Sequence, residues 1–244
     1  MHRTRPARLL VCAAVPLLLA ATACGGGGGE KKASPSPSAS SSAPAGGSSS
    51  PAPTPQAATF AKLPEVCRTI SEKTVDELVP KAKKKEGEAL ASSADPNDSA
   101  TCHWNGLNDS DVKNMQFHEL FVSLKRLTPD PTLGSADKRA QTFAQQQVMG
   151  ASKPTQGEEV KNVTTDKVDG IGNEATAVSF DSRKSDTDFR NTSVIARTAN
   201  VVVTVKYSGS GYQGAKTPSA DDIMKGAQTA AKEAVAAVAE ANKH

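Results

Sequence analysis

Apolar and polar positions alternate most regularly in the C-terminal half of the chain. Segment 201–207 places valines on one face of an extended strand and a mixed set of residues on the other. Three residues separate it from segment 193–197, and two strands so close in the chain form an antiparallel hairpin. Segment 115–127 alternates in the same way. Weaker alternation predicts further strands at 101–105, 160–168 and 175–180.

Three other segments have helical spacing, and each follows a serine that is suited to cap a helix. The first begins after Ser71, the second after Ser135, and the third runs from Ser219 to about Lys243. Strands grouped between helices predict an α+β fold, with one antiparallel β-sheet and the helices packed on one face. The apolar positions are Val75, Leu78 and Val79 in the first helix, Ala140, Phe143, Ala144 and Val148 in the second, and Ile223, Ala227, Ala230, Ala234 and Val238 in the third.

The first 23 residues have the pattern of a secretory signal peptide. Arg3, Arg5 and Arg8 precede an apolar run over 9–21, which ends in small residues. This run is too short to cross the bilayer as a mature helix, which takes about 20 residues. We therefore expect residues 1–23 to be removed on export.

The cleavage region indicates that the mature chain begins with a lipidated Cys24. Small residues precede Cys24 and resemble a lipobox, although Ala21 stands where leucine is more usual. The alternative is ordinary cleavage after Ala23, which would leave an exposed, unpaired thiol in an oxidising compartment. Lipidation removes that anomaly, and two acyl chains suffice for stable anchoring. The sequence thus predicts a lipoprotein held on the extracytoplasmic face of the cell membrane.

Residues 24–59 are predicted to form a lipid anchor at Cys24 followed by a flexible linker, which we call the leash. From residue 25 to residue 59 the chain consists mainly of Gly, Ser, Pro and Ala, with charges only at Glu30, Lys31 and Lys32. Such a composition buries too little apolar surface to offset the entropy of ordering. We expect a disordered linker of about 30–35 Å as a random coil. Residues 60–244 then form a single α+β extracytoplasmic domain.

The charge balance argues against nucleic acid as a partner. The formal net charge of +3 comes from 29 basic and 26 acidic side chains, and three of the basic ones are the arginines of the signal peptide. The mature chain is therefore neutral, and a neutral chain lacks the basic surface that nucleic acid or an anionic membrane face requires.

Cys67 and Cys102 remain once Cys12 has left with the signal peptide and Cys24 carries the lipid. An even pair in an exported domain predicts a disulfide. Its loop closure would stabilise the fold by about 4 kcal/mol in the chain-entropy model. A zinc site is the alternative, but two cysteines with no nearby Cys or His pair rarely form one.

The order of short motifs resembles a family of actinobacterial cell-envelope lipoproteins whose shared domain is of unknown function. The motifs are LPEVC at 63–67, TCHW at 101–104 and VDGIGNEA at 168–175, followed by the valine-rich hairpin and an alanine-rich last helix. More loosely, the arrangement is similar to extracytoplasmic sensor domains of mycobacterial receptor kinases. The resemblance implies a bridge from the first helix to the first strand, and a glycine where Ala199 stands. It implies no activity, cofactor or active site.

The candidate chemical motifs all have a simpler structural interpretation. Ser135 and Lys138 have the Ser-x-x-Lys spacing of penicillin-recognising enzymes, but a helix cap explains them, and the domain is too short for that fold. His103, His118 and His244 lack the spacing of a metal site. Segments 109–111 and 186–188 fit solvated turns better than a calcium loop. Trp104, next to the predicted disulfide, is expected in the core. The sequence predicts no catalytic residue, no metal and no cofactor.

Three functions from different classes remain. The first is a non-catalytic binding or sensing module that meets a small ligand, a cell-wall component or an envelope protein. The second is a secreted hydrolase with an unrecognised site. The third is an envelope structural or assembly factor. The anchor, the leash and the absence of a catalytic motif favour the first.

Overall fold

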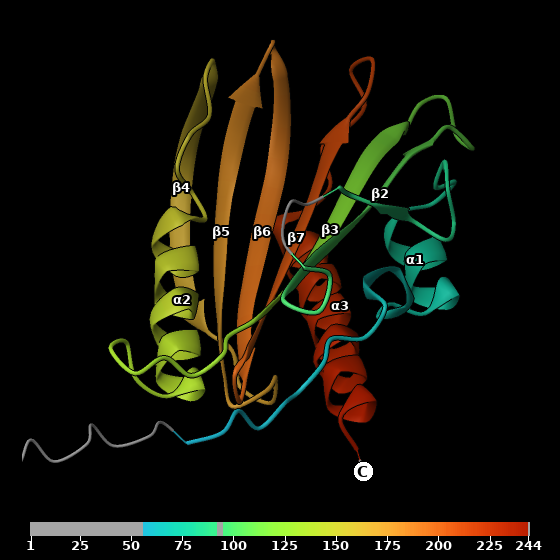
Figure 1. Cartoon of the computed structure of the whole chain (residues 1–244). Helices are drawn as coiled ribbons and strands as arrows, with labels where there is room; N and C mark the ends of the chain where they lie inside the picture. Colours follow the sequence, from blue (N-terminus) through green and yellow to red (C-terminus); the bar gives the residue numbers. More distant parts are fainter. Residues whose placement is uncertain (1–55, 92–94, 244) are drawn as a thin grey trace, which may run out of the picture. The chain divides into compact units, whose positions relative to one another are not determined.

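The computed structural model describes residues 56–91 and 95–243. These residues form one seven-stranded antiparallel sheet with three α-helices, which confirms the predicted α+β class (Figure 1). The strand order is β1-β2-β3-β7-β6-β5-β4. The strands are β1 (Glu88–Ala89), β2 (Ser99–Asn108), β3 (Gln116–Arg126), β4 (Glu158–Lys167), β5 (Glu174–Lys184), β6 (Thr187–Thr198) and β7 (Val201–Gly211). The helices are α1 (Glu72–Leu78), α2 (Ala136–Gly150) and α3 (Ala220–Ala241), preceded by a 3-10 turn, η1 (Val66–Arg68).

Several predicted features lie outside these residues. They are the signal peptide at 1–23, the lipidation site Cys24, the leash as far as residue 55, and His244. Within the described part of the chain, no helix combines the length and the apolarity needed to cross a membrane.

Each of the three α-helices begins directly after the serine that was predicted to cap it. The hydroxyl oxygens of Ser71, Ser135 and Ser219 accept hydrogen bonds from the backbone N–H three residues later. Each bond satisfies one of the N–H groups that a helix start leaves without a partner.

The central strand β7 is buried on both faces, and this decides where the helices lie. Val203 belongs to the apolar cluster beneath α1 and α3, whereas Val202 belongs to a second cluster beneath α2. A strand that is apolar on both faces needs cover on each side. Accordingly, α1 and α3 share one face, as expected, but α2 lies on the opposite face (Figure 1). This placement of α2 corrects the expectation that all helices pack on one face.

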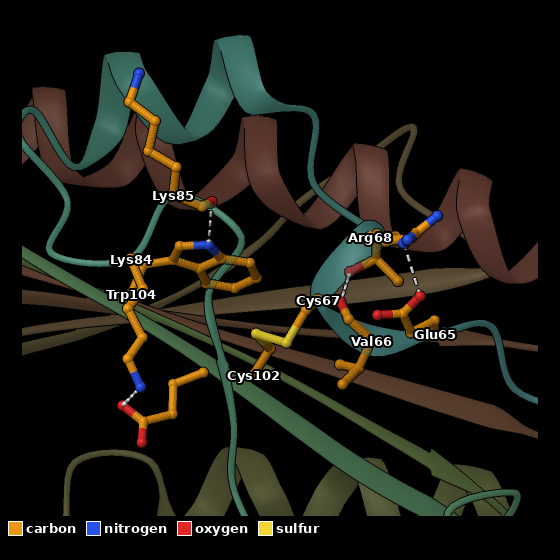
Figure 2. Close-up of a disulfide and its surroundings, with 10 residues drawn as sticks. Glu65, Val66, Cys67, Arg68, Lys84, Lys85, Cys102 and Trp104 are labelled. Carbon is orange, nitrogen blue, oxygen red and sulfur yellow. Dashed lines mark hydrogen bonds and ion pairs between the residues drawn. A yellow bond between two sulfur atoms is a disulfide. The ribbon is translucent and has the colours of Figure 1, made fainter.

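The predicted disulfide between Cys67 and Cys102 is present, with a Cα–Cα distance of 5.2 Å. It joins η1, rather than α1, to β2 (Figure 2). Trp104 lies beside it in the core, and its indole N–H donates to the carbonyl of Lys85 at 3.1 Å. Gly87 packs so closely that a Cβ there would lie 2.5 Å from Sγ of Cys102. The loop between α1 and β2 therefore needs glycine at this position.

The strand ends extend beyond their predicted bounds. Strand β6 begins at Thr187 rather than at residue 193, and its hairpin with β5 turns at Ser185 and Asp186, both with positive φ. The two-residue strand β1 had no counterpart in the alternation pattern. Polar strand ends pair through the backbone beyond the core, so they leave no apolar alternation to detect.

The first residues of the domain, directly after the leash, are fixed at one end of the fold. The backbone N–H of Phe60 donates to Oδ1 of Asn200 in the β6–β7 turn at 2.8 Å. The N–H of Ala61 donates to Oδ1 of Asn242, just after α3, at 3.0 Å. The side-chain amides of Asn200 and Asn242 donate back to the carbonyls of Phe60 and Lys62. The chain thus enters the fold beside the C-terminal end of α3.

Candidate functional site

An open pocket of about 590 Å³ lies at the N-terminal end of α3. We call it the α3-end pocket. Its walls come from the end of α1, the start of β3, the segment 216–219 and the first turns of α3, which are far apart in the sequence. The residues that carry the argument below are Glu77, His118, Tyr207, Lys216, Asp222 and Lys225.

Strand alternation places His118 and Tyr207 at this pocket. Leu120 is buried on the α3 face of β3, so His118, two residues earlier, has its side chain on the same face. Tyr207 pairs with Leu120 across β3 and β7. A close approach of α3 completes the wall, because a Cβ at Gly226 would lie 2.7 Å from Cε1 of Tyr207. Both polar side chains therefore lie where the apolar core ends.

The hydrogen bonds of Tyr207 define the tautomer of His118. The Tyr207 hydroxyl donates its one hydrogen to the carbonyl oxygen of Leu78 at 2.6 Å. The phenolic oxygen also lies 2.9 Å from Nδ1 of His118, and in this second bond it acts as the acceptor. Nδ1 must therefore carry the hydrogen, which leaves Nε2 of the neutral ring as an acceptor.

The surroundings keep both rings in these protonation states. Burial lowers the pKa of His118 below its ordinary value, which favours the neutral imidazole. Burial, together with the charge of Asp222, raises the pKa of Tyr207, so its hydroxyl keeps its hydrogen. His118 is only 9% exposed, and among the described residues none forms a hydrogen bond with its Nε2.

The lining of the pocket carries balanced charge. Glu77 and Asp222 are acidic, whereas Lys216 and Lys225 are basic. Asp222 is fixed by the cap of α3, because the Ser219 hydroxyl donates to its Oδ2 at 2.6 Å. The pocket as a whole thus offers donors and acceptors without a net charge of either sign.

Segment 216–218 is held against β3 by one side chain. Nε2 of Gln116 donates to the carbonyl oxygen of Lys216 at 2.9 Å. This contact forms part of the wall, and it places the Lys-Thr-Pro sequence at the pocket. Ser135, the serine of the Ser-x-x-Lys spacing, instead caps α2, as predicted.

The other histidine of the fold lies on the opposite face of the sheet. Nε2 of His103 lies 2.9 Å from Oε1 of Glu119, and its ring stacks on Phe121 with centroids 4.2 Å apart. Glu119 and Phe121 line a smaller cleft of about 350 Å³ near the end of α2. The nearby Ser123 hydroxyl bonds Oγ1 of Thr101 at 2.9 Å. This hydroxyl is therefore not paired with the imidazole as a catalytic nucleophile would be.

The remaining candidates from the sequence occupy structural positions. Trp104 is 1% exposed and belongs to the core, as predicted. Asp109 lies in an exposed turn and pairs with Lys81. Asp188 lies at the start of β6, and its Oδ1 is 3.1 Å from Nε of Arg183.

Sequence reasoning did not place His118 at a pocket. The available signal was the spacing of two residues between His118 and Leu120 in β3, because residues two apart in a strand have their side chains on the same face. The sequence contains no corresponding signal for the pocket itself, because Leu78, Tyr207 and Asp222 come from separate elements.

Comparisons with known proteins find little similarity. No protein-family model matches the chain, and no curated protein matches it. Among solved structures, the chain is similar to the crystal structure of LpqN, described as involved in cell envelope biogenesis of Mycobacterium tuberculosis, with a TM-score of 0.30 and 11% identity. The match covers 60% of this chain and 82% of that chain. A similarity at this TM-score carries no argument about this chain.

Proposed function

We propose that the chain is a lipid-anchored cell-envelope protein whose domain binds a ligand in the α3-end pocket without catalysing a reaction. The observation that carries this proposal is the ring of His118, which lines the pocket, is nine-tenths buried and has an unused acceptor at Nε2. Nε2 is not one of the described side-chain atoms that are fully buried without a partner, so it is open to the pocket, where a ligand donor can take the place of water. A polar group whose ring is held in one orientation, as Tyr207 holds His118, can fix the orientation of a bound molecule.

The position of the pocket relative to the leash supports the proposal. The leash enters beside Asn242, after the C-terminal end of α3, whereas Asp222 lines the pocket in its first turn. An α-helix of 22 residues spans about 33 Å. Residues 60–62, which follow the leash, and the pocket therefore lie at opposite ends of α3.

Binding is favoured over hydrolysis by the partners of His118. A general base needs a nucleophile or a water aligned by it, together with a group that orients the ring. Here Tyr207 orients the ring, but the Ser219 hydroxyl is committed to Asp222. In the described residues, no serine or cysteine forms a hydrogen bond with the imidazole of His118.

Photo-crosslinking on intact cells tests the proposed function. A diazirine amino acid at Thr229, which lines the pocket, is expected to form a covalent adduct with the ligand that intact-protein mass spectrometry detects. Glu240 provides a matched control, because it is exposed and lies three turns further along the same side of α3, near the leash. Adducts at position 229 but not at 240 support the proposal. No adduct at 229, or equal adducts at both positions, contradicts it.

A further inference from the structure

We propose that the α3-end pocket binds an uncharged, polyhydroxylated compound of the saccharide class, and that one ligand hydroxyl donates a hydrogen bond to Nε2 of His118. This inference rests on the proposed function, and it adds the chemistry of the ligand. Three features of the pocket support it.

The first feature is the hydrogen-bonding state of His118. Its Nδ1–H is used by Tyr207, so the ring presents only an acceptor to the pocket. Burial disfavours the imidazolium form, so the acceptor persists at neutral pH. A ligand must therefore bring a donor to this position, and a hydroxyl group is a donor that carries no charge.

The second feature is the balanced charge of the lining. Two carboxylates, Glu77 and Asp222, and two ammonium groups, Lys216 and Lys225, line the same pocket. A ligand with a net charge would meet like charges as well as opposite ones. A hydroxyl group accepts from an ammonium group and donates to a carboxylate at the same time. Several hydroxyl groups on one small molecule therefore suit this lining better than a single anion or cation.

The third feature is the type of neutral side chain in the walls. Amides and hydroxyls predominate. The hydroxyls of Ser219 and Thr229 already donate to Asp222 and to the carbonyl of Lys225, so they remain acceptors, whereas an amide offers a ligand both a donor and an acceptor. The volume of about 590 Å³ lies within the usual range for small-molecule pockets. The ring of Tyr207 is 4% exposed, so recognition would depend on hydrogen bonds rather than on stacking. The neutral polar residues are Asn114, Gln116, Thr217, Ser219 and Thr229.

Histidine-selective NMR of the purified full chain tests the inference. Long-range ¹H–¹⁵N spectra resolve Nδ1 and Nε2, and His103 serves as the internal control. The uncharged probes are glucose, mannose and N-acetylglucosamine, and the comparison probes are acetate, inorganic phosphate and N-acetylalanine amide. We expect at least one saccharide to shift the Nε2 resonance of His118 and to leave that of His103 unchanged. Its affinity should change less than about twofold between low and high salt, because an uncharged ligand is not screened.

A variant separates binding from folding. His118→Phe removes the acceptor but leaves the Tyr207 bond to Leu78, and we expect saccharide affinity measured by calorimetry to fall roughly three- to tenfold. Circular dichroism verifies that the variant is folded. If His118→Phe does not fold, the salt dependence and the Nε2 shift of the unmodified chain decide the matter.

The possible outcomes distinguish the ligand class from the existence of a site. If only acetate, phosphate or the amide shifts the Nε2 resonance, the saccharide inference is wrong and the binding function stands. If a saccharide binds without moving that resonance, the inference is also wrong. If no probe shifts it, the saccharide inference fails, and the crosslinking at Thr229 independently decides whether the pocket is a binding site.

Discussion

Nδ1 of His118 lies 2.9 Å from the phenolic oxygen of Tyr207, and this bond joins β3 to β7 at the point where the apolar core ends. The same oxygen carries the hydrogen bond to the carbonyl of Leu78, at the end of α1. One phenolic group therefore connects two strands and a helix that are far apart in the sequence. It also determines that Nδ1 of His118 carries the hydrogen and that Nε2 is the free acceptor.

Removing the Tyr207 hydroxyl should destabilise the fold. In Tyr207→Phe the carbonyl of Leu78 and Nδ1 of His118 both lose a buried partner, and we expect the free energy of unfolding to fall by about 1–3 kcal/mol. Urea denaturation measures this loss. Tyr212→Phe is the matched control, because Tyr212 is 46% exposed, and it should change stability little. Equal effects of the two substitutions would show that the buried bonds of Tyr207 contribute nothing.

Acidification should expose the contribution of His118 to stability. Its pKa is lowered in the fold, so between the folded value and about 6.5 the unfolded chain binds more protons. The free energy of unfolding therefore decreases as the pH falls below about 6.5, and His118→Phe should lose this component. Thermal unfolding of both chains between neutral pH and about pH 5 measures the difference.

The charged side chains at the pocket are the same in both chains, so they do not affect this comparison. Glu77, Lys216, Asp222 and Lys225 line the same pocket and are present in both chains. An identical pH dependence in the two chains would contradict the assignment of a buried, neutral imidazole.

Replacing Ala199 by glycine should stabilise the β6–β7 hairpin. Ala199 has a φ of 48°, a conformation that costs a residue with a Cβ about 1–2 kcal/mol. Glycine relieves this strain but adds entropy to the unfolded chain, so we expect a net gain of about 0.5–1 kcal/mol. Ala236→Gly, at an exposed position inside α3, should instead destabilise by about 0.5–1 kcal/mol. Urea denaturation measures the change in the free energy of unfolding for both variants. A destabilised Ala199→Gly would contradict the claim that Ala199 is strained.

Lipidation of Cys24 remains a prediction, and it has a direct test. Cells fed a labelled fatty acid should transfer the label to the wild-type chain and not to Cys24→Ser. The variant should be released from the membrane fraction, because stable anchoring requires acyl chains. A Cys24→Ser chain that stays bound to membranes would contradict the predicted anchor.

The sequence predicts the strands and helices that contribute to the core. Leu120 and Val203 lie in alternating apolar segments, and Ser71 and Ser219 begin helices as expected. The resemblance implied a glycine at position 199, and the structure shows that Ala199 has a positive φ, the conformation that favours glycine.

The positions of the helices on the sheet and the site could not be predicted from the sequence, for a physical reason. The position of α2 depends on both faces of β7 being apolar, and valines on both faces do not indicate which helix covers which side. The pocket depends on Leu78, Tyr207 and Asp222, which are close only after the strands pair. Spacing along the chain contains no information on such contacts.

The central claim is that an anchored domain carries an occupied α3-end pocket, and native mass spectrometry of the chain extracted gently from membranes tests it most directly. The account predicts the covalent mass of acyl groups on Cys24 and, in addition, a non-covalently bound small molecule that is lost in folded His118→Phe. A chain with no bound molecule, or the same bound mass on His118→Phe, would contradict it.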